Sequence, residues 1–128
     1  GRLTAVEIWG RNTMSGNPGT FQLDVHTVDS TGLPVGNPLA TATVSASRFS
    51  TEEAWVRFTF PAPARLVPRQ QYALVILLNK ARPEDRGYFD TSNDQCPNGH
   101  YFFSNTRTSS FEHGIPTPDL GYKTFVKP

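Results

Sequence analysis

The sequence predicts an all-β fold, a two-sheet antiparallel β-sandwich that is jelly-roll-like and has about eight short strands. Apolar and polar residues alternate with a period of two along most of the chain, and no long stretch has the period of a helix. Turn-forming residues separate the alternating stretches, with 10 glycines and 11 prolines among 128 residues. Short alternating stretches between such turns are typical of a sandwich or a barrel.

The same alternation gives the order of the strands. They are expected at residues 3–9, 20–28, 39–45, 54–60, 71–78, 88–89, 100–104 and 119–126. Residues 71–78 are apolar on both faces, which predicts a central strand that is covered on two sides. Residues 29–38 form a turn dense in glycine and proline, and residues 47–53 form a polar connection. Pro61 and Pro63 are expected to end the fourth strand, because proline cannot donate to a ladder.

Length and charge narrow the functions that the chain can have. One domain is expected to span residues 1–128, with enough buried surface to fold without disulfides or metal. The net charge is +1, from 12 basic and 11 acidic residues without a basic cluster, so we expect no nucleic-acid partner. The longest apolar run, residues 73–78, is too short to cross a bilayer. The chain opens inside an expected strand without a signal peptide, so we expect a module excised from a larger secreted protein.

The sequence contains none of the common local motifs of enzymes. It has no G-x-S-x-G elbow, no H-E-x-x-H zinc motif and no glycine-rich phosphate loop. The carboxylates that could pair across a sandwich, as those of a glycosidase do, are Glu7, Glu52, Glu53, Glu84 and Glu112. Most of them lie in expected loops, where solvated carboxylates are the default. We therefore expect a protein that is not an enzyme.

Both tryptophans fall on strand faces that a sandwich core does not need. Trp9 shares its face with Glu7, and Trp55 shares its face with Arg57. If the two strands are neighbours in one sheet, these four residues form an aromatic platform with polar groups beside it. Sugars offer C–H groups to aromatic faces and hydroxyls to planar hydrogen-bonding groups, so the platform predicts a carbohydrate site. The strand at residues 20–28 adds two residues that we expect to project the same way, Asp24 and His26.

A second candidate site is the long polar loop at residues 90–100. Its candidate residues, with the aromatic residues that bracket it, are Tyr88, Asn93, Asp94, Gln95, Asn98, His100 and Tyr101. Loops on rigid β scaffolds often carry specificity, although an ordinary solvated loop has the same composition. Asp90, Asp94 and Asp119 could hold a structural calcium ion, but no D-x-D-x-D loop is present. We therefore predict no metal site and no required cofactor.

Three stretches together resemble a known class of module. They are Leu-Thr-Ala-Val-Glu-Ile-Trp at 3–9, Trp-Val-Arg-Phe-Thr-Phe-Pro at 55–61 with Tyr-Ala-Leu-Val-Ile-Leu at 72–77, and Asp-Leu-Gly-Tyr-Lys-Thr-Phe-Val at 119–126. In this order the chain resembles non-catalytic β-sandwich accessory modules of secreted bacterial proteins, which include jelly-roll carbohydrate-binding modules. Such families usually have a glycine turn before the central strand, where this chain has Pro68, Arg69 and Gln70. The resemblance implies a polysaccharide ligand, a covalently linked catalytic or surface domain, and a secreted or cell-surface location.

Hypotheses from three classes follow. A carbohydrate-binding accessory module, which targets an attached enzyme to polysaccharide, predicts exposed coplanar aromatic rings. A structural or adhesion spacer module of a bacterial surface protein predicts that Trp9 and Trp55 are both covered. A small hydrolase or lyase predicts two acids, or a histidine and an acid, that face each other in a cleft. The first is our main prediction and the second is its alternative; for both we expect a monomer.

Overall fold

The computed structural model describes residues 1–12, 19–79, 87–89, 91–92, 102–103, 112–113, 119–120 and 122–128. Its long strands are β1 (Arg2–Asn12), β2 (Thr20–Val28), β3 (Pro34–Ser45), β4 (Ala54–Arg65), β5 (Tyr72–Asn79) and β11 (Tyr122–Lys127). One short 3-10 helix, η1 (Ala46–Arg48), joins β3 to β4. The shorter strands are β6 (Gly87–Phe89), β7 (Thr91–Ser92), β8 (Phe102–Phe103), β9 (Glu112–His113) and β10 (Asp119–Leu120).

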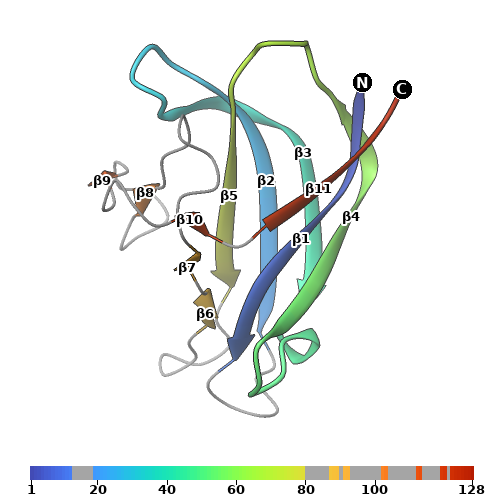
Figure 1. Ribbon diagram of the computed structural model, residues 1–128, viewed down its shortest axis with the longest axis vertical. Coiled ribbons are helices and arrows are strands. Elements are labelled where there is room, and N and C mark those ends of the chain that lie inside the picture. The colour runs from blue at the N-terminus through green and yellow to red at the C-terminus, as the bar shows by residue number, and fades with distance from the viewer. Residues whose placement is uncertain are drawn as a thin grey trace.

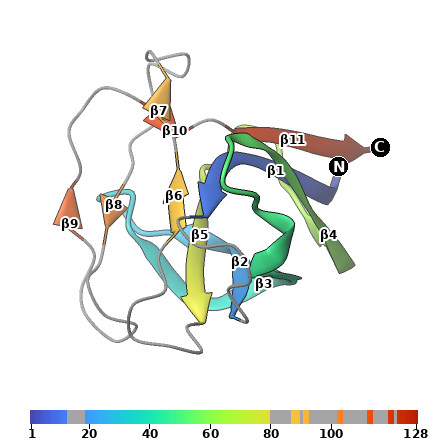
Figure 2. The same cartoon turned by 90° about the horizontal axis from the view of Figure 1, so that it is seen from below.

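The long strands form two antiparallel sheets that pack face to face, so the predicted β-sandwich is confirmed. One sheet has the order β11-β1-β4 and the other has the order β3-β2-β5. Figure 1 looks onto the first sheet with the second behind it, and Figure 2 shows the two layers from below. The first and last strands of the chain are neighbours, as expected for a jelly-roll-like sandwich. Six long strands replace the eight short ones that we expected, and the rest are segments of two or three residues among those described.

One apolar core fills the space between the two sheets. Its large residues are Leu3, Val6, Ile8, Phe21, Leu23, Val25, Phe49, Val56, Phe58 and Phe60. Phe49 follows η1 and packs between the sheets, with its ring centroid 4.6 Å from that of Phe21 and 6.2 Å from that of Phe58. The inward faces that alternation predicted for β1, β2 and β4 are therefore confirmed.

Proline does not end β4, contrary to the prediction. The strand continues through Pro61 and Pro63 to Arg65 at the edge of its sheet. The register with β1 shifts here, because Ala5 pairs with Thr59 whereas Leu3 pairs with Ala64. Prolines on an edge strand at such an irregularity leave no required ladder donor missing. In the same way β3 begins at Pro34, five residues earlier than the predicted Leu39, on the outer edge of the other sheet.

β5 is apolar on both faces, as predicted, but it is not central. Among the described residues it pairs with β2 alone, at one end of the order β3-β2-β5. Leu74 and Ile76 pack against the core, and Val75 on the opposite face is also buried. The turn before β5 holds Arg69 at a φ of 64°, the left-handed conformation that favours the glycine of the resembling families. Among the described residues, no helix has the length and apolar character needed to span a membrane.

The turn between β2 and β3 is organised by Asp29. Its Oδ1 accepts hydrogen bonds from the Thr31 hydroxyl at 2.6 Å, the Thr31 amide at 2.8 Å and the Leu33 amide at 3.1 Å. Gly32, in the same turn, has a φ of 86°, which a residue with a side chain adopts with strain. Hydrogen bonds to the ionised carboxylate, with that of the Thr31 hydroxyl the strongest, lower the pKa of Asp29 below its ordinary 3.8.

Thr31→Val is expected to raise the pKa of Asp29 back toward 3.8, because it removes the hydroxyl donor. The native pKa is lowered, so the turn's contribution to stability is present above pH 3.8 and is lost as the pH falls through the folded pKa. NMR titration of the Asp29 carboxyl carbon measures the shift, and Thr31→Ser, which keeps a hydroxyl, is the control. An unchanged pKa in Thr31→Val would show that the hydroxyl is not the cause.

Candidate functional site

The outer face of the β11-β1-β4 sheet carries both tryptophans as neighbours. Trp9 and Trp55 are direct cross-strand partners, with ring centroids 5.2 Å apart. Trp9 is half-buried and Trp55 is 40% exposed. The two strands are thus neighbours in one sheet, which is the condition for the predicted platform. The rings are inclined at 59°, so they form an angled pair and not the coplanar surface that we expected.

A row of charges crosses the same face beside the tryptophans. In the register of the sheet, Glu7 lies between Arg57 on β4 and Lys123 on β11. Arg57 Nη1 donates to Glu7 Oε1 at 3.3 Å. The Arg57 side chain is 47% exposed and that of Glu7 20%, so this ion pair contributes at most about 1 kcal/mol to stability. Its value to the site is that it places a donor group and an acceptor group beside the indoles.

Two cations of this row rest on aromatic rings of the far strand. Lys123 Nζ lies 4.0 Å from the centroid of the Trp55 ring. The Arg57 guanidinium carbon lies 4.1 Å from the centroid of the Phe125 ring. Each side chain thus spans β1, because Lys123 and Phe125 belong to β11 and Trp55 and Arg57 belong to β4. Such contacts contribute about 0.5–1 kcal/mol each at exposed sites, and they hold both cations over the face.

A second row on this face consists of three cations. Arg2 pairs with Lys127 on one side and with Arg65 on the other, and all three are exposed. They project outward because their neighbours Leu3 and Ala64 belong to the core. Among the described residues, no carboxylate lies within ion-pairing distance of any of the three. Like charges directly opposite each other destabilise a sheet.

We call this outer surface of the β11-β1-β4 sheet the front face. Its residues are Arg2, Glu7, Trp9, Trp55, Arg57, Arg65, Lys123, Phe125 and Lys127. The nine residues include five cations and one carboxylate, and Arg11 of β1, in phase with Glu7 and Trp9, adds a sixth cation to the face, whereas β2, β3 and β5 of the other sheet contain no lysine or arginine. Sequence reasoning missed this separation of charge, because the cations belong to three strands and form no local run.

Arg65→Glu is expected to raise the free energy of unfolding by about 0.5 kcal/mol. The substitution replaces the like-charged pair Arg65–Arg2 by a pair of opposite charge at an exposed position. Urea denaturation at low salt measures the gain, which should shrink at high salt as the charges are screened. Arg65→Ala should give a smaller gain. A loss of stability in Arg65→Glu would contradict the placement of Arg65 opposite Arg2.

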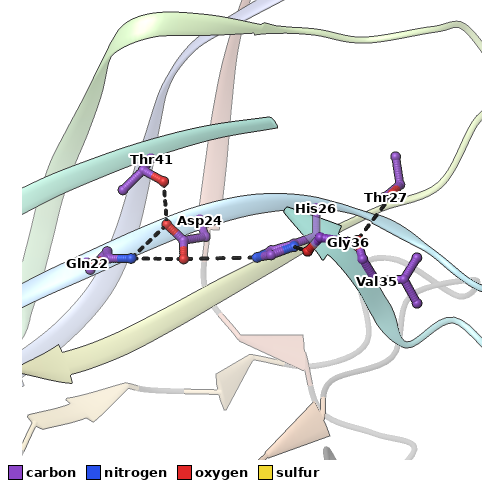
Figure 3. A network of polar contacts seen from close by, with 7 residues as sticks. All are labelled: Gln22, Asp24, His26, Thr27, Val35, Gly36 and Thr41. Atoms are coloured by element: carbon purple, nitrogen blue, oxygen red, sulfur yellow. Dashed lines mark hydrogen bonds and ion pairs between the residues drawn. The ribbon is translucent and has the colours of Figure 1, made fainter. Parts of the chain in front are cut away.

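Asp24 and His26 do not join the tryptophans, so this part of the predicted site is wrong. They lie on β2, which belongs to the other sheet, and they point to that sheet's outer face. Asp24 is 5% exposed, and its carboxylate accepts hydrogen bonds from Gln22 Nε2 at 2.9 and 3.0 Å and from Thr41 Oγ1 at 2.7 Å. Figure 3 shows this network, in which Thr41 comes from the neighbouring strand β3.

His26 completes the network and links it to the beginning of β3. Its Nε2 lies 4.0 Å from Asp24 Oδ2, and its Nδ1 lies 3.2 Å from the Gly36 carbonyl oxygen. A carbonyl oxygen only accepts, so Nδ1 carries the proton in this contact. The network joins β2 to β3 around the buried Asp24 carboxylate, with Gln22 and His26 half-buried and Thr41 exposed, which is the arrangement of a structural network. Among the described residues, no three histidine, cysteine, aspartate or glutamate side chains gather as metal ligands would.

The second candidate site lies outside the described residues, apart from Tyr88. That residue belongs to β6 and pairs with Arg11 of β1. Its other members, Asn93, Asp94, Gln95, Asn98, His100 and Tyr101, lie outside the described residues, and so does Asp90 of the calcium hypothesis. Asp119, the remaining residue of that hypothesis, belongs to β10, which pairs with β7.

No protein-family model, no curated protein and no solved structure matches this chain. The front face is where the described structure exposes aromatic and charged groups together.

Proposed function

We propose that the domain is a carbohydrate-binding module and that the front face is its binding surface. The observation that carries the proposal is the position of Trp55, which is 40% exposed and paired with Trp9 on the solvent side of a sheet. A tryptophan that a sandwich core does not use has a large apolar face to offer to the C–H groups of a sugar ring. Glu7 and Arg57 beside it offer acceptors and donors to sugar hydroxyls.

The angle between the two rings favours a particular mode of binding. A flat crystalline polysaccharide surface requires coplanar rings, whereas these two are inclined at 59°. An angled pair can contact successive sugars of one twisted chain on two different sides. We therefore propose binding along a single polysaccharide chain.

The accessory role belongs to the same proposal. The strand motifs that resemble accessory modules support attachment to a catalytic or surface domain and a secreted or cell-surface location. In this role the module holds its linked domain against a polysaccharide, and the chemistry resides in the linked domain.

Trp55→Ala and Trp9→Ala test the proposal. Affinity electrophoresis through gels that contain single polysaccharides identifies those that retard the protein. Each substitution should then weaken retardation by the bound polysaccharide about tenfold or more, because an aromatic contact is lost. Leu39→Ala is the control, since Leu39 is 44% exposed but lies on β3 of the other sheet. Unchanged retardation in both tryptophan variants would remove the front face as the binding surface.

A structural or adhesion spacer module is the second candidate, and one observation favours it. Lys123 Nζ already occupies one side of the Trp55 ring, and Trp9 is half-buried. In a spacer these contacts serve packing alone. A spacer would be retarded by none of the polysaccharides. In a spacer, the substitutions Lys123→Ala and Trp55→Ala would lower the free energy of unfolding and leave the electrophoretic mobility in every gel the same as in a gel without polysaccharide.

A further inference from the structure

The Lys123–Trp55 contact determines what a ligand meets on the front face. The Lys123 ammonium lies 4.0 Å from the centroid of the Trp55 ring, so one side of the most exposed indole is covered by a cation. A neutral sugar that stacks on this side must displace the lysine and lose the cation–π contact. An anionic group can bind the ammonium where it stands and keep that contact.

The row of Arg2, Arg65 and Lys127 also favours an anionic ligand. Three like charges stand opposite one another without a carboxylate partner among the described residues, and this arrangement opposes folding. Nothing in the sandwich core requires cations at these positions, because all three side chains are exposed. An anionic ligand would supply the missing counter-charge. The guanidinium forks of Arg2 and Arg65 match the planar oxygen pair of a carboxylate.

From these two rows we infer that the front face binds an acidic polysaccharide, a sugar chain that carries carboxylates as uronic acids do. The inference rests on the proposed function and names the class of its ligand. In this arrangement the sugar rings contact Trp55 and Trp9, and the carboxylates bind Lys123 and the Arg2 row. Glu7, the one acid among the residues of the face, accepts hydrogen bonds from sugar hydroxyls.

The spacing of the cations favours a glycan over a nucleic acid. Lys123 and Lys127 are four residues apart on one strand, which separates the two cationic rows by about 13 Å. The row between them, formed by Phe125, Ala5 and Thr59, has no cationic residue of its own, although the Arg57 guanidinium lies over its Phe125 ring. Duplex DNA carries a charge about every 1.7 Å, and single strands stack successive bases on successive rings. A polymer with widely spaced charges and hydroxyls between them fits this face better.

The experiment compares polygalacturonate with its methyl-esterified form, which has the same sugars without the charges. Calorimetric titration is done at about 0.01 M salt, where the Debye length is about 30 Å, and at about 1 M, where it is about 3 Å. We expect polygalacturonate to bind at least about tenfold more tightly than the ester at low salt, and the difference to vanish at high salt. Arg65→Glu should weaken binding of polygalacturonate about tenfold and leave binding of the ester unchanged.

Arg48→Glu is the matched control, because it changes the net charge equally but is an exposed residue of η1, in the connection from β3 to β4. Compared at about 0.15 M salt, where the Debye length is about 8 Å, its affinity should stay within about twofold of the parent's, since a charge outside the site is then screened. The thermal midpoint of each variant confirms that it folds.

The other outcomes distinguish failure of the inference from failure of the proposed function. Equal binding of both polymers, lowered by Trp55→Ala but not by Arg65→Glu, would overturn the inference and leave the proposed function standing. Binding of neither polymer, together with no retardation by neutral polysaccharides, would overturn both. Tighter binding of dextran sulfate or of poly(dT), lost in Arg65→Glu, would overturn the assignment to a carboxylated glycan.

Discussion

Phe58→Ala is expected to lower the free energy of unfolding by about 3–5 kcal/mol. Phe58 is fully buried on the inner face of β4, and its ring packs near that of Phe49. Removing the ring loses the transfer free energy of the aromatic side chain and leaves a cavity that the two sheets can only partly close. Urea denaturation followed by far-UV circular dichroism measures the loss.

The neighbouring position provides a control for this prediction. Thr59→Ala changes an exposed residue of the same strand and should cost at most about 1 kcal/mol. Phe58→Leu should lie between the two, because it keeps most of the apolar volume. If Phe58→Ala were no more destabilising than Thr59→Ala, the inward face assigned to β4 would be wrong.

Asp24→Ala is expected to cost about 2 kcal/mol, the second largest effect. The carboxylate accepts two hydrogen bonds from the Gln22 amide and one from the Thr41 hydroxyl. Alanine leaves the half-buried Gln22 amide without its partner, and the hydroxyl of the exposed Thr41 loses its acceptor. A donor shielded from water costs more than a hydrogen bond contributes. The loss is measured by the same denaturation experiment.

Asp24→Asn distinguishes loss of the network from loss of charge. Asparagine keeps one oxygen for the Thr41 hydroxyl, and the Gln22 amide can turn to offer its own oxygen to the new NH₂ group. We therefore expect Asn to cost about half as much as Ala at this position. Equal and small losses in both variants would show that the network contributes little to the β2–β3 pairing.

The sequence was sufficient to predict which face of a strand each side chain lies on, because this depends only on neighbouring residues. Alternation assigned Val6 inward and Trp9 outward, and the same reasoning held for Phe58 and Trp55. These assignments hold because successive side chains of a strand must point to opposite faces. The sandwich class followed from the same pattern and from the turn residues.

The sequence could not predict which strands share a sheet or which residues lie opposite each other, because both depend on pairing between distant strands. Asp24 has the outward phase of Trp9, but β2 belongs to the other sheet, and phase alone does not assign a strand to a sheet. The row of Arg2, Arg65 and Lys127 likewise exists only through register, and its members are separated by 63 and 62 positions in sequence. The prediction that prolines end β4 was wrong because proline is tolerated in an edge strand, and the sequence does not show which strands are edges.

Tryptophan fluorescence reports directly on whether the front face binds a polysaccharide. The chain has 2 tryptophans, and both lie on this face, so the signal reports on no other surface. Acrylamide, a neutral quencher, is titrated with and without saturating polygalacturonate. We expect the polysaccharide to lower the quenching constant severalfold and Trp55→Ala to remove most of this protection. Quenching that is unchanged at a polysaccharide concentration shown by calorimetry to saturate the protein would contradict binding at the front face.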